Sequence, residues 1–139
     1  MVTTKQKKTA VTPTNRDLLD QTVVAHLATA RPDGSLQNNP VWFEWDGSEI
    51  KISQTRDRQK VRNMVHDPHV AISVTDPENP YRYVEVRGVV DRIEDDADRS
   101  FVDGLAQRYM GKPRYDMDPP DADRVIVHIR PTDSSAMAA

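Results

Sequence analysis

The sequence predicts a mainly β domain of the α+β class, built on a six-stranded antiparallel sheet with two or three flanking helices. Apolar and polar residues alternate in several short segments, which is the period of half-buried strands. Turn signals, such as RPDG at residues 31–34 and Asp46-Gly47, join consecutive strands as hairpins. Six short strands joined in this way can close into a small barrel, and closure removes exposed strand edges.

The N-terminal half is predicted to hold one short helix and three strands. The helix covers residues 14–21, with Thr14 as its cap and Leu18 and Leu19 as its apolar contacts. The strands cover residues 23–30, 36–45 and 49–54. Pro40 lies inside the second strand and has no N–H for a ladder, so this stretch is either an edge strand or an irregular segment that faces a ligand.

The central part predicts a helix between two further strands. Val61, Met64 and Val65 recur at helical spacing, which predicts a helix over residues 58–66. Strands follow at residues 70–75 and 83–93, separated by a proline-broken loop at 76–82. Gly88 marks a bulge or bend in the longer strand.

The C-terminal part predicts a second, longer helix and a last strand. The acidic residues Asp95, Asp96 and Asp98 favour a helix start, and Gly111 ends the helix. Its buried stripe consists of Phe101, Val102, Leu105 and Tyr109. Residues 113–123 form a loop, and alternation over residues 125–129 predicts the sixth strand.

The start of the first long helix carries a basic cluster that could bind an anion. We expect Asp57 to cap this helix, while Arg58 and Lys60 lie on its first turn. An anion there would meet free amide groups, a guanidinium and an ammonium. Ser53 and Thr55 would add hydroxyl donors from the preceding strand. The same charges also fit an ordinary solvated helix face, and the two interpretations remain open on this pattern alone.

The amino-acid composition limits the classes of function that the chain can have. The chain has 139 residues, which fits one domain, expected over 14–133 between a polar disordered leader at 1–13 and a flexible tail at 134–139. A net charge of -3 argues against duplex-DNA binding. The absence of cysteine excludes disulfides and thiolate chemistry and favours the cytoplasm, and no apolar run is long enough for a membrane span. The histidines show no metal-site spacing, so no metal is expected.

From Val23 to Pro131 the chain resembles the split β-barrel flavin and deazaflavin oxidoreductases, the pyridoxamine 5'-phosphate oxidase-like superfamily, whose fold is the FMN-binding split barrel. Within it, the chain is most similar to actinobacterial reductases that use coenzyme F420. The blocks that carry the resemblance are LATARPDGSLQNNPVWFEWDG, SQTRDRQKVRNMVHDPHVAISV, YVEVRGVV and VIVHIRP. The resemblance implies a homodimer with a cofactor site at its interface and a small-molecule substrate.

The resemblance also implies which residues bind the cofactor. The phosphate would lie on Ser53, Thr55, Arg58 and Lys60, beside Gln59, and the cofactor ring would lie against Gln37, Asn38, Asn39, Pro40 and Val41. Tyr81 and Tyr83 would approach from the partner subunit, although ordinary sheet aromatics fit the same pattern. Arg56, Lys51, Arg62, Lys112 and Arg114 are candidates for the polyglutamate tail of F420, or solubilising charges. Catalytic residues are not identified.

The implied activity is hydride transfer from reduced F420 to a conjugated, hydrophobic small molecule. Two alternatives remain at this point. One is an FMN-binding oxidase, although the C-terminus HIRPTDSSAMAA lacks the arginine and histidine motif of pyridoxamine 5'-phosphate oxidases proper. The other is a non-enzymatic flavin or haem carrier, in which His26 or His128 would have to face the groove as the axial ligand of haem.

Overall fold

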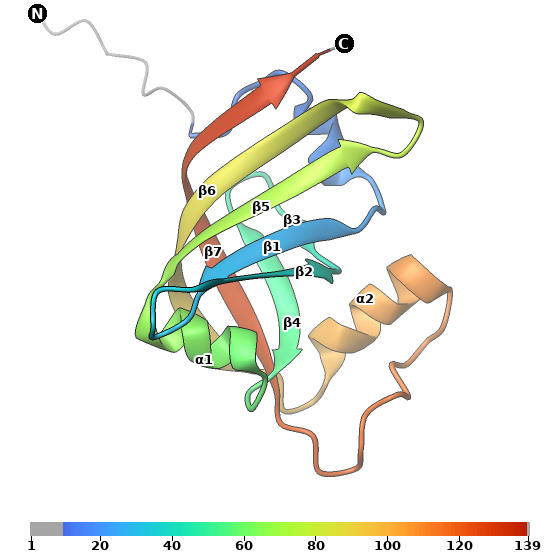
Figure 1. Cartoon of the computed structure of the whole chain (residues 1–139). Coiled ribbons are helices and arrows are strands. Elements are labelled where there is room, and N and C mark those ends of the chain that lie inside the picture. The colour runs from blue at the N-terminus through green and yellow to red at the C-terminus, as the bar shows by residue number, and fades with distance from the viewer. Residues whose placement is uncertain (1–9, 139) are drawn as a thin grey trace, which may run out of the picture.

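Seven antiparallel strands form one sheet in the computed structural model, which describes residues 10–138 (Figure 1). The sheet order is β2-β1-β5-β6-β7-β4-β3. The strands are β1 (Ala25–Ala30), β2 (Leu36–Val41), β3 (Glu44–Trp45), β4 (Ile50–Thr55), β5 (His69–Asp76), β6 (Asn79–Asp95) and β7 (Arg124–Met137). The helices are the 3-10 helix η1 (Arg16–Asp20) and the α-helices α1 (Gln59–His66) and α2 (Ser100–Met110).

The prediction of six strands in a closed barrel is wrong in strand number and in closure. The expected strand 36–45 breaks after Val41, because the Tyr109 hydroxyl of α2 takes over the hydrogen bonding of the Phe43 backbone. It lies 3.2 Å from the Phe43 nitrogen and donates to the Phe43 carbonyl oxygen at 3.1 Å. Consequently β2 and β3, although close in sequence, form the two open edges of the sheet. Pro40 is thus on an edge strand, as one of the two interpretations required.

One face of the sheet is filled with apolar side chains. The alternating buried residues of the longer strands follow the predicted pattern, and η1 adds Leu18 and Leu19 while the β2–β3 link adds Phe43. The strand residues of this core include Ile50, Ile52, Val70, Ile72, Val74, Val84, Val86, Val125, Val127 and Ile129. Because these side chains occupy the interior, a large ligand would bind outside the core.

Both ends of the described chain are better ordered than the sequence predicted. Val11, expected in a disordered leader, is 2% exposed, and the Thr12 N–H donates to the Ser134 hydroxyl at 2.8 Å. Residues 134–137, expected in a flexible tail, continue β7, where Met137 pairs with Tyr83 of β6. The two ends therefore stabilise each other. The rest of the expected leader, residues 1–9, lies outside the described residues, as does residue 139.

The expected loop 76–82 is instead a tight hairpin. Asp76 of β5 already pairs with Asn79 of β6, so Tyr81 lies in a strand. The predicted irregularity at Gly88 is confirmed, because the β6–β7 register shifts between Arg87 and Gly88. A Cβ at Gly88 would lie 2.7 Å from the carbonyl oxygen of Arg130, which explains why glycine stands there.

The helix starts differ from the predicted caps. Asn15 rather than Thr14 precedes η1, in a left-handed conformation, and its amide donates to the carbonyl oxygens of Tyr83 and Met137. At α2 the prediction holds better: the Asp96 carboxylate accepts the N–H groups of helix residues 101 and 102, and Gly111 ends the helix with φ 67°. None of the helices in residues 10–138 is long and apolar enough to cross a membrane.

Candidate functional site

A cleft of about 1030 Å³ lies outside the apolar core, at the end of β4. In Figure 1 this end of β4 points between α1 and α2. One wall comes from Pro40 and Val41 at the end of β2 and from Trp42 in the β2–β3 link. A second comes from the β4–α1 connection and the start of α1. Residues of α2 and of the loop 113–123 form the remaining wall. A volume of this size accommodates a ligand as large as a cofactor.

The start of α1 presents two cations without an anion. Lys60 is 7% exposed, Arg58 is exposed, and within residues 10–138 neither side chain has a carboxylate partner. Burial lowers the pKa of the Lys60 ammonium, and the Arg58 guanidinium lowers it further. No side chain caps the helix, so the prediction that Asp57 does so is wrong. Both cations are thus available to an anion at the positive end of the helix, which fits a phosphate group.

Two hydroxyls and a third cation face the same space. Ser53 and Thr55 are on β4, and Thr55 pairs directly with Arg124 of β7. The Arg124 guanidinium donates to the Ser53 hydroxyl at 3.3 Å, with Nε and Nη2 bonded to the Asp118 carboxylate at 2.7 and 2.8 Å. Its carbon lies 4.6 Å from the centre of the Tyr115 ring. The two hydroxyls expected to bind the phosphate therefore lie beside a side chain from the last strand.

Aromatic side chains form the wall beside these polar groups. Trp42 stacks on Tyr109, with ring centres 5.0 Å apart, and meets the edge of Tyr115 at 5.8 Å. Burial raises the pKa of the Tyr109 phenol, whose hydroxyl can donate to the carbonyl oxygens of Val23, ahead of β1, and Phe43, in the β2–β3 link. Val102 and Leu105 of α2 and the exposed Met117 continue the apolar surface. The cleft thus combines an anion-binding end with an aromatic side, as a phosphorylated ring compound requires.

Comparison with known proteins identifies the family. The family model for pyridoxamine 5'-phosphate oxidase matches residues 11–138, nearly the whole chain. The chain belongs to the pyridoxamine 5'-phosphate oxidase family. The resemblance stated from the sequence is confirmed.

Solved structures agree with this family assignment. One similar structure is an F420 reductase, 47% identical, with a TM-score of 0.79 over 86% of this chain and 94% of that chain. A conserved hypothetical protein from Mycobacterium tuberculosis is 22% identical, with a TM-score of 0.69 over 94% of this chain and 88% of that chain. General Stress Protein 26 from Bacillus anthracis is 19% identical, with a TM-score of 0.63 over 87% of this chain and 88% of that chain. The last two show only a shared fold. No curated protein matches the chain.

The structure divides the residues expected to bind a cofactor in this pyridoxamine 5'-phosphate oxidase family member into two groups. The residues that line the cleft are Pro40, Val41, Ser53, Thr55, Arg58 and Lys60. Those that do not line it are Gln37, Asn38, Asn39, Gln59, Tyr81 and Tyr83. Tyr81 and Tyr83 lie on β6 near its hairpin with β5, and Tyr81 is 71% exposed.

A buried amide cluster connects α1 to β2 behind the cleft. Asn63 of α1 is fully buried and donates to the Thr29 hydroxyl at 3.0 Å and to the Gln37 side chain at 3.2 Å. Its oxygen accepts from Gln59 at 2.8 Å, and Gln37 in turn donates to Asn39 at 2.7 Å. Gln37, Asn39 and Gln59 thus meet in this cluster, although the sequence placed them at the cofactor.

Most candidates for the polyglutamate tail are paired with acceptors. Arg56 bonds to Asp123 and Asp95, Lys51 lies 3.7 and 3.6 Å from Glu44 and Asp46, Lys112 lies 3.8 Å from Asp116, and Arg62 donates to Gln59. Arg114 is exposed and has no such pair among residues 10–138. A tail would therefore compete with existing partners at every candidate except Arg114.

Sequence reasoning missed the contribution of the loop 113–123 and of β7. Trp42, Tyr115, Asp118 and Arg124 all line the cleft, and none was predicted to do so. Tyr115 and Asp118 lie in RYDMD, directly after the second helix, and its density of aromatic and charged residues is their one sequence signal. That signal does not say against which strand the loop packs.

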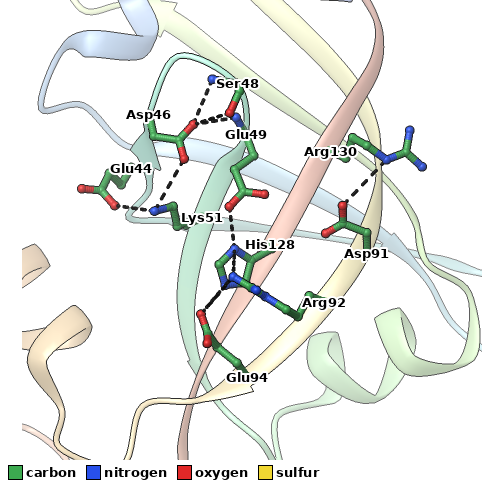
Figure 2. A network of polar contacts seen from close by, with 10 residues as sticks. All are labelled: Glu44, Asp46, Ser48, Glu49, Lys51, Asp91, Arg92, Glu94, His128 and Arg130. Atoms are coloured by element: carbon green, nitrogen blue, oxygen red, sulfur yellow. Dashed lines mark hydrogen bonds and ion pairs between the residues drawn. The ribbon is translucent and has the colours of Figure 1, made fainter.

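His128 is enclosed by charged side chains on the outer face of the sheet. Figure 2 shows its ring between Glu49 and Glu94, with Nδ1 and Nε2 each 2.6 Å from a carboxylate oxygen, and with Arg92 3.2 Å from Nε2. His128 is 3% exposed. Neither His128 nor the exposed His26 lines the cleft, so the geometry offers neither as an axial ligand for haem there.

The β3–β4 turn, also in Figure 2, provides a pH-dependent contribution to stability. Burial of Asp46 opposes its ionisation, but N–H groups of Glu49 and Ser48, at 2.8 and 2.9 Å, and the Ser48 hydroxyl lower the pKa to about 2. Because the folded pKa is below the unfolded value of 3.8, this stabilisation is present above pH 3.8 and is lost as the pH falls toward 2.

We expect D46A to lower the free energy of unfolding by about 1 kcal/mol at pH 7, a figure reduced for solvent screening because a third of the side chain is exposed. At pH 2 the difference between D46A and wild type should be less than half as large. Urea unfolding at both pH values checks this, with D20A, at an exposed site outside such a turn, as the control. An equal loss at both pH values would contradict it.

Proposed function

We propose that this member of the pyridoxamine 5'-phosphate oxidase family is an oxidoreductase that uses coenzyme F420. It would transfer a hydride from the reduced deazaflavin to a conjugated, hydrophobic small molecule. The observation that carries the proposal is the uncapped start of α1, where Arg58 and the buried Lys60 lack an anion. The 47% identity to a protein named F420 reductase supports the choice of deazaflavin.

In this proposal the residues of the cleft bind and orient the cofactor. Lys60, Arg58 and the hydroxyls of Ser53 and Thr55 hold the phosphate. When bound, the deazaflavin supplies the hydride, and the chemistry requires no strong acid or base from the protein. The Pro40–Trp42 wall would align the ring, while the apolar residues of α2 exclude water from it.

FMN is the second candidate cofactor, because it carries a phosphate on a similar ring system and the matching family is named for an oxidase. Titration of the purified apoprotein with F420 and with FMN separates the two. Tighter binding of F420 is the expected result. Submicromolar binding of FMN with no binding of F420 would overturn the assignment of the cofactor.

We further propose a homodimer in which Tyr81 and Tyr83 approach the cleft of the partner. Two observations support this: neither tyrosine lines the cleft of its own chain, and Tyr81 is a large, exposed aromatic residue. Tyr83 pairs with Met137, which is also exposed. A mass measurement at micromolar concentration should return a dimer. A monomer alone would contradict the shared site.

A further inference from the structure

We propose that Arg124 is a further ligand for the phosphate in the cleft, held in place by Asp118 and Tyr115. The inference rests on the proposed function, because its ligand is the phosphate of that cofactor.

The position of Arg124 follows from the pairing of β4 with β7. Thr55 and Arg124 are directly opposite each other in neighbouring antiparallel strands, and Ser53 lies two residues along β4. Residues opposite each other, and residues two apart, present their side chains to the same face of a sheet. The guanidinium therefore lies beside both hydroxyls, and its Nη1 is 3.3 Å from the oxygen of Ser53.

The guanidinium is fixed before any ligand arrives. The Asp118 carboxylate accepts two hydrogen bonds from Nε and Nη2, and the Tyr115 ring lies 4.6 Å from the guanidinium carbon. The side chain of Arg124 is only 11% exposed. These contacts occupy one edge and one face of the group and leave Nη1 toward Ser53 and the cleft. Fixing the rotamers in advance lowers the entropy cost of binding an anion.

Asp118 does not neutralise the cluster. Arg99 also donates to Asp118, at 3.0 Å, so one carboxylate is shared by two guanidinium groups and one positive charge remains. Arg99 itself does not line the cleft, whereas Arg124 does. Of the other acidic residues on the cleft, Asp123 is paired with Arg56, and Asp57 and Asp121 are exposed. The buried part of the cleft near Ser53 thus favours an oxyanion.

The test compares ligands with and without a phosphate. F420 and FMN carry one, while the bare deazaflavin riboside and riboflavin have similar ring systems without it. We expect R124Q to raise the Kd of F420, or of FMN, about tenfold, equivalent to about 1.4 kcal/mol, and to change the Kd of the phosphate-free ligands less than twofold. R124K, which keeps the charge but not the bidentate geometry, should raise the Kd of F420, or of FMN, about threefold.

R130Q is the matched control, because Arg130 lies on the same strand, is paired with Asp91 and does not line the cleft. It should change the Kd of F420 less than twofold. An unchanged Kd in R124Q would overturn the inference. An equal loss of affinity for the phosphate-free ligands in R124Q would show that Arg124 only anchors the loop and would also overturn the inference.

The K60M variant separates failure of this inference from failure of the proposed function. If K60M weakens F420 binding and R124Q does not, only the role of Arg124 is wrong. If neither variant changes the Kd of any phosphate ligand, or the wild type binds none of them, the phosphate site itself is wrong. If R124Q does not fold, R124K provides the same comparison between ligands with and without phosphate.

Discussion

K60M is expected to weaken binding of F420 about 100-fold, equivalent to about 2.7 kcal/mol, and at the same time to stabilise the ligand-free protein. The loss of affinity follows from burial, because a charge interaction is stronger where water is excluded. Lys60 is 7% exposed and is the least accessible cation on the cleft that has no carboxylate partner among the described residues. Isothermal titration measures the Kd.

The gain in stability follows from the direction of the pKa shift. Burial and Arg58 lower the pKa of Lys60 in the folded state below its unfolded value of 10.5. The charged form therefore destabilises the folded protein at neutral pH, and this cost disappears as the pH rises through the folded pKa toward 10.5. Methionine removes the charge and keeps the apolar stem, so we expect a gain of about 1 kcal/mol at pH 7 that is lost as the pH rises toward 10.5.

R62M is the control for K60M, because Arg62 lies on the same helix but is exposed and does not line the cleft. It should change the Kd of F420 less than twofold and the stability by less than about 0.5 kcal/mol. A K60M protein that binds F420 as well as wild type would place the phosphate elsewhere. Lower stability of ligand-free K60M would show that the ammonium has a stabilising partner.

N63L is expected to lower the free energy of unfolding by about 3 kcal/mol, the largest loss of stability predicted for a single substitution here. Asn63 is fully buried, and leucine would leave the Thr29 hydroxyl and the side chains of Gln37 and Gln59 without their partner. N63D keeps the shape but removes both amide donors, so it should also destabilise at pH 7. Chemical denaturation measures the free energy of unfolding of both variants.

N38L provides a matched control on β2. Asn38 is exposed, and its side chain makes no hydrogen bond to the described residues. We expect N38L to change the free energy of unfolding by less than about 0.5 kcal/mol. A loss in N63L no larger than that in N38L would show that the amide cluster does not hold α1 against β2.

The features that could be predicted from sequence depend on neighbours along the chain. The alternation of Ile50 and Ile52 and the helical spacing of Val61 and Met64 placed β4 and α1 correctly. Lys60 lies on the first turn of α1 as predicted, whereas Arg58 is the N-cap residue just before it. Gly111 likewise ended α2 as expected, because a left-handed cap requires only local geometry.

The features that were missed depend on contacts between distant residues. The break after Val41 is caused by the hydroxyl of Tyr109, 66 residues from Phe43 in the chain. Arg124 reaches the cleft because β7 pairs with β4, a partner that alternation cannot identify. Asp57 failed as a cap although its residue type and position fit, because the chain leaves β4 in a turn closed by Arg58 and Thr55 backbone groups.

The position of β7 in the sheet has a consequence for biosynthesis. β7 is the last strand of the described chain, yet it lies between β6 and β4, so β4 and β3 join the other strands of the sheet only through it. During translation the first four strands of the sheet order, β2-β1-β5-β6, can pair as they leave the ribosome, whereas β4, paired only with the short β3, must wait for β7. β4, which carries Ser53 and Thr55, can therefore take its final place in the sheet only after β7 has been synthesised.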